Sequence, residues 1–189
     1  MDAKGIVRAA LVLTVLTVIL LGGLYPLAVW GIGHVVFSSQ SEGSLITKNG
    51  ETIGSSLIGQ HFASDKYFHG RPSAAGKDGY DATSSSGSNL GPTSKALADR
   101  VAADRLTLAA SDGKDPPVDL LTTSGSGLDP HISIAAAHYQ VPRVARARHL
   151  DAARIEELIS RHTEGRTLGL LGEPRINVLE LNLDLDSLH

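Results

Sequence analysis

The chain has 189 residues, of which 42% are hydrophobic and 20% are charged, and its formal net charge is −3. Because 17 Lys and Arg residues stand against 20 Asp and Glu residues, there is no basic surplus of the kind that nucleic-acid binding requires, and the composition argues against nucleic acid as a partner. The sequence contains no cysteine, so a folded domain in it must rely on a hydrophobic core and not on disulfides.

An uncharged segment near the N-terminus is the most distinctive feature of the chain. Residues 9–37 contain no Lys, Arg, Asp or Glu. A helix crosses a hydrocarbon core about 30 Å thick with about 20 apolar residues, so the segment predicts one transmembrane helix in the lipid bilayer, preceded by a short tail at residues 1–8. A cleaved signal peptide is the alternative, since Gly31 and Gly33 could serve at a cleavage site, but the apolar part of such peptides is usually about 7 to 15 residues long.

Small and helix-breaking residues interrupt the middle of this segment. Gly22 and Gly23 would let another backbone approach closely, and Tyr25 and Pro26 follow them. A proline also frees a backbone carbonyl that a neighbouring helix could satisfy. The pattern predicts a docking surface for a partner helix, and a lone anchor with a kink is the alternative.

Charges on either side of the segment indicate its orientation. Lys4 and Arg8 precede it, whereas the first charged residue after it is Glu42. Basic residues concentrate on the cytoplasmic side of a membrane helix. We therefore expect a cytoplasmic N-terminus and an extracytoplasmic domain at residues 38–189, which is a typical length for one compact domain.

Turn signals organise the first part of that domain. Residues 43–60 place Asn49 and Gly50 between two apolar runs, and this pair predicts a β-hairpin because both residues tolerate the positive φ of a type I′ turn. Residues 61–92 are rich in Gly, Ser, Pro and Asp, a composition that predicts irregular structure.

Helical patterns follow. The spacing of apolar residues predicts an amphipathic helix at residues 95–110 and a second helix at residues 132–147, which Pro142 would kink or break. A third helix is expected to begin at the capping residue Asp151 and to end before Gly165.

The C-terminal residues 177–186 alternate leucine with polar side chains. A period of two places every leucine on one sheet face, so the pattern predicts a strand. With helices between this strand and the hairpin, we expect a small α+β domain in which the last strand joins the hairpin. The acidic residues on the other face are Glu180, Asp184 and Asp186. One interpretation is that they form only a solvated sheet face, and the other is that they attract cations near a transport entrance.

Short catalytic and metal-binding patterns give weak signals. The eight histidines are scattered, and His131 and His138 would lie about 10.5 Å apart along a helix, so no metal site is predicted. Residues 122–133 bring serines, Asp129 and His131 together, but they lack the GxSxG pattern and favour a helix cap over a catalytic triad. Residues 70–78 do not fit the Walker A pattern, so no nucleotide or other cofactor is assigned to this chain.

Longer sequence patterns in the chain are far more specific for a protein family than these short catalytic patterns. They are LYP at residues 24–26, GSLI at 43–46, IGSSLIGQ at 53–60, YFHGRPSA at 67–74, SSGSNLGPTS at 85–94, SGSGLDPHIS at 124–133, HTEGR at 162–166 and LGEPRINVLELNLDLD at 171–186. In this order and over nearly its whole length, the chain resembles the C subunits of bacterial Kdp-type potassium-transporting P-type ATPases.

The resemblance implies an accessory role without catalysis. Members of this family are single-span subunits of a complex in the bacterial plasma (inner) membrane. The implied partners are a channel-like potassium-translocating subunit, an ATP-hydrolysing P-type subunit and a very small single-span subunit, and the complex as a whole handles ATP and potassium. The family is also described as a catalytic chaperone that raises the nucleotide affinity of the ATP-hydrolysing partner. The P-type phosphorylation motif DKTGT is absent from this sequence.

The resemblance and the residue types together suggest where partners bind. We expect the span to pack against the channel-like subunit and the outer domain to rest over its external mouth, held by the irregular motif segments. The partner-binding residues expected outside the span are Tyr67, Phe68, His69, Arg71, Ser86, Asn89, Asp129 and His131. Internal packing is the alternative for each of them. An extracytoplasmic enzyme built around Asp129 and His131, or a sensor-like domain, is the alternative function.

Overall fold

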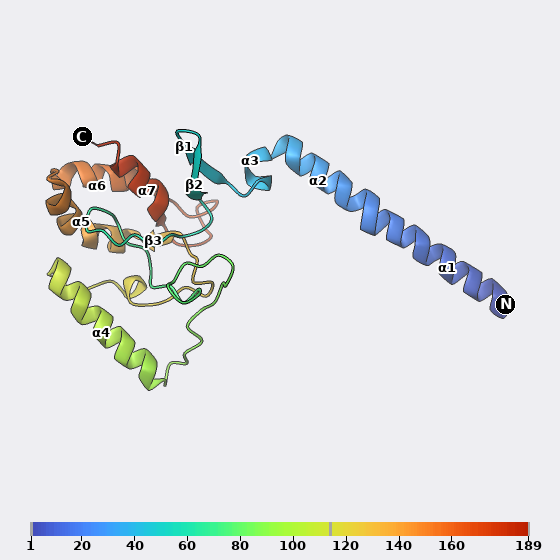
Figure 1. Ribbon diagram of the computed structural model, residues 1–189, viewed down its shortest axis with the longest axis horizontal. Helices are drawn as coiled ribbons and strands as arrows, with labels where there is room; N and C mark the ends of the chain where they lie inside the picture. Colours follow the sequence, from blue (N-terminus) through green and yellow to red (C-terminus); the bar gives the residue numbers. More distant parts are fainter. Residues whose placement is uncertain (1, 114, 189) are drawn as a thin grey trace. The chain divides into compact units, whose positions relative to one another are not determined.

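The computed structural model describes residues 2–113 and 115–188, and the chain divides into two compact units, Met1–Leu45 and Ile46–His189 (Figure 1). The first unit contains the apolar helix and the second contains the hydrophobic core.

The first unit is one long helix followed by a short one. Helix α1 (Ala3–Ile19), a π-helical turn η1 (Leu20–Leu24) and helix α2 (Tyr25–Val36) run on continuously, and α3 (Ser38–Ser41) follows. Ala3–Val36 is the one helix among the described residues that is long and apolar enough to cross a membrane. The predicted helix at residues 9–37 is therefore present, and it begins earlier because Lys4 and Arg8 are also helical.

The π-helical turn explains how the helix accommodates its proline. Pro26 has no N–H, and in a regular helix its ring would meet the carbonyl four residues earlier, that of Gly22. The turn is widened instead, and the Tyr25 N–H donates to the Leu20 carbonyl five residues back. A Cβ added at Gly22 or Gly23 would meet no atom within 4 Å, so this surface of the unit is open.

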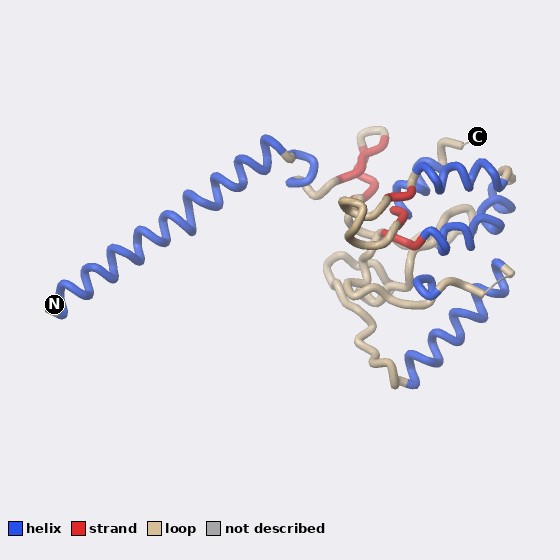
Figure 2. The backbone as a smooth tube through the Cα atoms, turned by 180° about the vertical axis from the view of Figure 1, so that it is seen from behind, coloured by secondary structure: helices blue, strands red, loops and turns tan. Residues whose placement is uncertain are grey.

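The second unit begins with the predicted hairpin. Strands β1 (Leu45–Lys48) and β2 (Glu51–Ser55) pair as a two-stranded sheet. Asn49 and Gly50 have φ of 56° and 83°, which confirms the turn chemistry. Residues 56–94, all of them described, then contain no helix or strand, as expected; Figure 2 draws them as a long loop.

Three of the predicted helices are present. Helix α4 (Lys95–Asp112) begins after the capping residue Ser94 and ends at Gly113, whose φ is 74°. Helix α6 (Ala152–Arg161) begins after Asp151, whose side chain accepts from the Ala153 N–H. Helix α5 (Ile134–Arg148) starts two residues later than predicted and continues through Pro142.

The later start of α5 reflects a small sheet that the sequence did not reveal. Strands β3 (His131–Ser133), β5 (Arg175–Asn177) and β4 (Thr163–Glu164) form an antiparallel sheet in the order β3-β5-β4. A short 3₁₀ turn, η2 (Val118–Leu120), precedes them. On the central strand Ile176 pairs with Ile132 on one side and with Thr163 on the other.

The prediction of a C-terminal strand was wrong. Residues Val178–Leu185 form helix α7, capped by Asn177, whose side chain accepts from the N–H groups of Leu179 and Glu180. Burial follows a helical spacing, because Val178, Leu181 and Leu185 are buried. The last segment therefore does not join the hairpin, and the hairpin remains a separate sheet.

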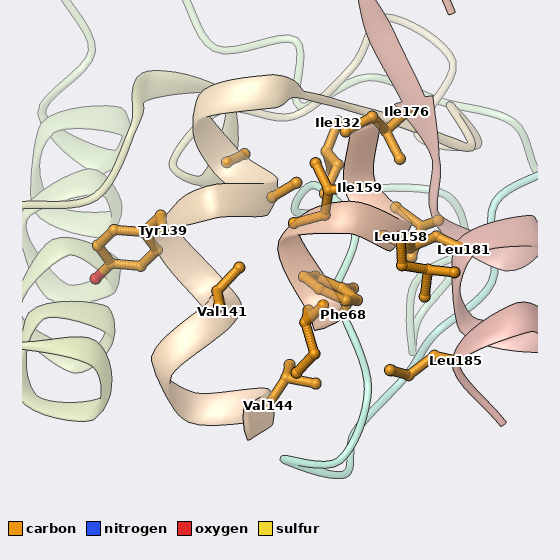
Figure 3. Packing of buried hydrophobic residues seen from close by; sticks show 14 of the residues in the cluster. Phe68, Ile132, Tyr139, Val141, Val144, Leu158, Ile159, Ile176, Leu181 and Leu185 are labelled. Carbon is orange, nitrogen blue, oxygen red and sulfur yellow. The ribbon is translucent and has the colours of Figure 1, made fainter. Parts of the chain in front are cut away.

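The core lies among α5, α6 and α7, where α5 packs against α6 and α6 against α7 (Figure 1). Phe68 enters this core from the irregular segment and is fully buried. Figure 3 shows its ring among the aliphatic side chains of the cluster, which include Val144, Leu158, Leu181 and Leu185.

Two buried amide side chains, which we call the amide clamp, hold the backbone beside that ring. Asn182 accepts from the Phe68 N–H at 2.8 Å and donates to the Phe68 carbonyl at 2.9 Å. Gln140 does the same for His69, at 2.8 and 3.1 Å. The clamp thus satisfies two backbone N–H groups and two backbone carbonyls of a segment that has no strand neighbour.

Arg143 extends the clamp. Its guanidinium is almost completely buried and donates to the carbonyls of Asp65 and Tyr67 at 2.8 and 3.0 Å, and to Gln140 Oε1 at 2.7 Å. Its Nε lies 3.6 Å from the buried carboxylate of Asp112, whose pKa burial raises above its usual range even though the arginine charge opposes this.

We predict that Asn182→Ala lowers the free energy of unfolding by about 2–4 kcal/mol, because the N–H and carbonyl of Phe68 lose their partner inside the core. Urea unfolding of the full chain in detergent and hydrogen exchange at the Phe68 amide would measure it. The control Glu180→Ala, on the same helix, should change the unfolding free energy by less than about 0.5 kcal/mol. Equal stability of the two variants would contradict the role of the clamp.

Candidate functional site

A charged cleft beside β3 and β5 is the candidate functional site. Its volume is about 480 Å³. The residues that line it come from four segments distant in sequence; they are Arg71, Asp119, Asp129, His131, Ile132, Ser133, Glu173, Pro174 and Arg175. The cleft therefore brings together Arg71, Asp129 and His131, which the sequence had singled out.

A chain of alternating basic and acidic side chains, which we call the charge chain, begins in this cleft and includes Glu164 beside it. Arg71 Nη1 lies 3.1 Å from Asp129 Oδ2, and His131 Nδ1 lies 3.2 Å from Asp129 Oδ1. His131 Nε2 faces Glu164 Oε2 at 4.0 Å, and Arg175 Nη2 lies 3.0 Å from the same oxygen. Each carboxylate is thus placed between two nitrogen groups.

The surroundings keep Asp129 ionised. Partial burial by itself would raise the pKa of this carboxyl, but hydrogen bonds from the His131 side chain and backbone, and then from Arg71, outweigh it and hold the pKa below its usual range. Burial, with the Asp129 charge adding to it, raises the pKa of Tyr80 to about 12. The Tyr80 hydroxyl therefore stays protonated and donates to the Arg71 carbonyl at 2.6 Å.

This geometry favours capping and charge pairing over nucleophilic catalysis. In a Ser-His-Asp triad the second histidine nitrogen faces a hydroxyl. Here His131 Nε2 faces the Glu164 carboxylate instead. Ser133 lines the same cleft, but its hydroxyl accepts from the Ala136 N–H as the cap of α5. The predicted helix cap at Asp129 was wrong, because His131 begins strand β3 and Ser133 caps α5 instead; Asp129 accepts from the His131 N–H two residues later.

The motif segments of the irregular region pack on one another. The Ser86 N–H and the Ser85 hydroxyl both donate to the Ser126 carbonyl, at 2.9 and 3.0 Å. The Ser73 hydroxyl donates to the Gly127 carbonyl at 2.6 Å. Gly127 has φ of 68°, and a Cβ there would lie 2.5 Å from the Ser86 carbonyl oxygen, so only glycine fits this crossing.

Most of the residues expected to bind a partner have contacts inside the domain. The Tyr67 hydroxyl donates to Asp186 Oδ2 at 3.2 Å, and Arg148 lies 4.8 Å above the Tyr67 ring. Phe68 is a core residue. Burial, followed by the charge of Arg143, holds the pKa of His69 below its usual value.

The remaining expected residues differ in exposure. Ser86 is half-buried in the crossing described above, whereas Asn89 is exposed at a positive φ of 53°. Internal packing thus accounts for Tyr67, Phe68, Arg71, Asp129 and His131, and a contact between any of these residues and a partner stays a prediction.

The three acidic residues near the C-terminus lie on a helix and not on a sheet face. Asp186 pairs with Arg148 at 2.7 Å, and Asp184 with His162 at 2.8 Å. Glu180 is half-buried in the first turn of α7. Arg148 and His162 therefore contact two of the carboxylates, and attraction of cations by this surface stays a prediction.

Sequence reasoning missed the amide clamp and two of the five residues of the charge chain, Glu164 and Arg175. Gln140 stands between Tyr139 and Val141, and Asn182 stands between two leucines, so a polar residue within an apolar stretch was the available signal. Glu164 and Arg175 carried no signal, because only the small sheet brings them to His131. Among the described residues no group of three or more His, Asp or Glu side chains could hold a metal ion.

The fold and the site define a class of protein: a small α+β domain whose charged cleft is built from long motif segments, on a chain with one apolar helix of membrane-spanning length. The family described as "KdpC: K+-transporting ATPase, c chain" matches residues 7–187. The chain belongs to this family.

Relatives of similar length support the assignment. The potassium-transporting ATPase KdpC subunit of Koribacter versatilis is 53% identical over 184 residues, which cover 97% of this chain and 94% of the relative. The subunit of the same name from Dechloromonas aromatica is 54% identical, with 97% and 98% covered. That of Methylobacterium nodulans is 52% identical, with 96% of each covered.

We predict that Asp129→Asn destabilises the second unit by about 1–3 kcal/mol at neutral pH, because Arg71 and His131 lose a charged acceptor. Since the pKa of Asp129 is lower in the folded chain, its contribution is complete above the ordinary carboxyl pKa of about 4 and is lost as the pH falls toward the folded-state pKa. Urea unfolding at a series of pH values would measure the difference. Asp78→Asn, at an exposed loop position, is the control; a constant difference down to low pH would contradict the assignment.

Proposed function

We propose that this chain is a non-catalytic accessory subunit of an ATP-driven potassium uptake complex in the bacterial plasma membrane. Membership of the family supports the proposal, as do the names of its relatives. The proposed partners are a channel-like potassium-translocating subunit, an ATP-hydrolysing P-type subunit and a small single-span subunit. The charged side chains in and beside the cleft pair with one another, which supports a structural role for them.

The proposed topology is a single span with a cytoplasmic N-terminus. Lys4 and Arg8 lie in the first turns of the long helix, and the first acidic residue after it is Glu42. Such an asymmetry favours the basic end in the cytoplasm. Residues 38–189 would then be extracytoplasmic and could not reach cytoplasmic nucleotide.

The span provides the proposed contact with the channel-like subunit. The π-helical turn places two glycines where a second backbone can approach, and the carbonyl that Pro26 leaves free can be satisfied by a neighbouring helix. With the span held there, the second unit would rest near the external mouth of the same partner. Any effect on the nucleotide affinity of the ATP-hydrolysing subunit would be relayed through the span and the channel-like subunit.

Topology is testable with single cysteines, because the chain has none of its own. We predict that Ser187→Cys reacts with a membrane-impermeant maleimide in cells whose inner membrane is intact, whereas Ala3→Cys reacts only after lysis. Mass-shift labelling on gels would measure both. The reverse pattern would overturn the proposed orientation.

Assembly is testable at the π-helical turn. We predict that Gly22→Leu with Gly23→Leu reduces co-purification of the channel-like subunit in mild detergent by about tenfold and abolishes growth at limiting potassium, because bulk at a close helix contact prevents packing. Ala28→Leu, which adds the same bulk elsewhere in α2, is the control. An unchanged complex would show that the span is only an anchor.

A further inference from the structure

An exposed apolar loop on the second unit has no role in the fold or in the charged cleft. We call residues 167–172 the leucine loop. Leu168, Leu170 and Leu171 are 89%, 80% and 64% exposed. Elsewhere among the described residues that follow the hairpin, strongly exposed aliphatic side chains stand singly in the sequence, as Leu106 and Val118 do. Exposed apolar side chains that gather at one place mark an interaction surface, whereas single ones are normal.

The loop has a fixed shape. Thr167 and Leu171 exchange two backbone hydrogen bonds, at 2.8 and 3.0 Å, and the Gly169 N–H donates to the Arg166 carbonyl at 3.0 Å. Leu168 has φ of 55°, a conformation that is unfavourable for a residue with a Cβ. The backbone therefore holds the leucine side chains outward in a defined arrangement. This arrangement is maintained although the positive φ of Leu168 is strained and although exposure of apolar side chains to water is unfavourable.

Ion pairs close the base of the loop. Arg166 Nη2 lies 2.8 and 2.7 Å from the two carboxylate oxygens of Glu173. The next pair along the chain is Arg175 with Glu164, which belongs to the charge chain. Glu173 and Arg175 also line the charged cleft, so the base of the leucine loop lies at the edge of that cleft.

The balance of charges around the leucine loop distinguishes between two possible binding partners of the loop, an anionic lipid bilayer and a protein surface. Loops that insert into anionic lipid combine apolar side chains with unpaired basic residues. The arginines at this base are paired with carboxylates, and the whole chain carries a net charge of −3. A fixed shape and balanced charges fit a complementary protein surface better than a fluid bilayer, which selects for no particular shape.

We propose that the leucine loop docks into an apolar recess on the extracytoplasmic surface of another protein subunit, whose rim carries polar groups that meet the charged cleft. The inference rests on the proposed function, because it requires that the chain assembles with such a partner. It assigns the apolar part of the docking surface to residues 167–172, whereas Arg71 belongs to the polar part because it lines the charged cleft.

The test is a triple variant of the full chain, Leu168→Asn, Leu170→Ser and Leu171→Ser, in the intact complex. Asn is chosen at the first position because it tolerates a positive φ. Leu106→Ser with Val118→Ser, which removes exposed aliphatic side chains elsewhere, is the matched control. We expect the yield of complex purified with the triple variant to be about tenfold lower, because loss of a buried apolar anchor weakens an interface by such an amount. The midpoint of urea unfolding of the triple variant should equal that of the wild type.

A second measurement identifies the occupant. A photo-crosslinking amino acid in place of Leu170 should form an adduct with a protein subunit in the assembled complex. Crosslinking to lipid alone, or quenching of a fluorophore on Leu170→Cys by spin-labelled lipid, would overturn the proposal in favour of a membrane contact. Full assembly and potassium uptake with the triple variant would overturn it and leave the proposed function standing. Failure of the wild-type chain to co-purify with a potassium-transport complex would overturn both.

Discussion

The amide clamp is the interaction on which the second unit depends. A segment without strand neighbours can enter a core only if its peptide groups find other partners, since a buried N–H or carbonyl without one costs as much as a lost hydrogen bond. Asn182 and Gln140 supply those partners from two different helices. Phe68 can therefore fill the centre of the core although its backbone is irregular.

The same dependence explains why the motif segments are long and rich in small residues. The loop at residues 124–130 is the hub of the irregular region, since Leu128 accepts from the Gly59 N–H and Pro130 from the Val178 N–H, at 2.8 and 2.9 Å. It thus joins the region after the hairpin to the start of α7. Where segments of backbone cross this closely, glycine is required at Gly127 and hydroxyl groups are required beside it. The motif residues of this region therefore serve to build the domain.

Two apolar surfaces differ from the paired side chains of the charge chain. The charge chain is satisfied within the domain, whereas the leucine loop and the π-helical turn present apolar surface without a partner in their own unit. Both rely on a local departure from regular backbone, a positive φ at Leu168 and a widened turn before Pro26. In each case the departure places apolar surface where a second molecule can cover it.

The sequence by itself determined the elements whose signals are local. The absence of charge at residues 9–37 indicated the long helix, because an apolar run of this length suits a lipid bilayer. Asn49 and Gly50 indicated the hairpin through the dihedral angles of its turn, and Asp151 indicated the start of α6 because it can cap a helix. Each of these signals lies within a few residues of the element. The motifs likewise identified the family. Only the tertiary structure decided the state of residues 178–185, where a period of two aligns all four leucines as a strand would, although the helix that forms buries Leu181 and Leu185 together with Val178. Packing in the core and the bonds of Asn182 to Phe68 select the helix, and these contacts join residues more than a hundred positions apart, beyond the reach of any local pattern.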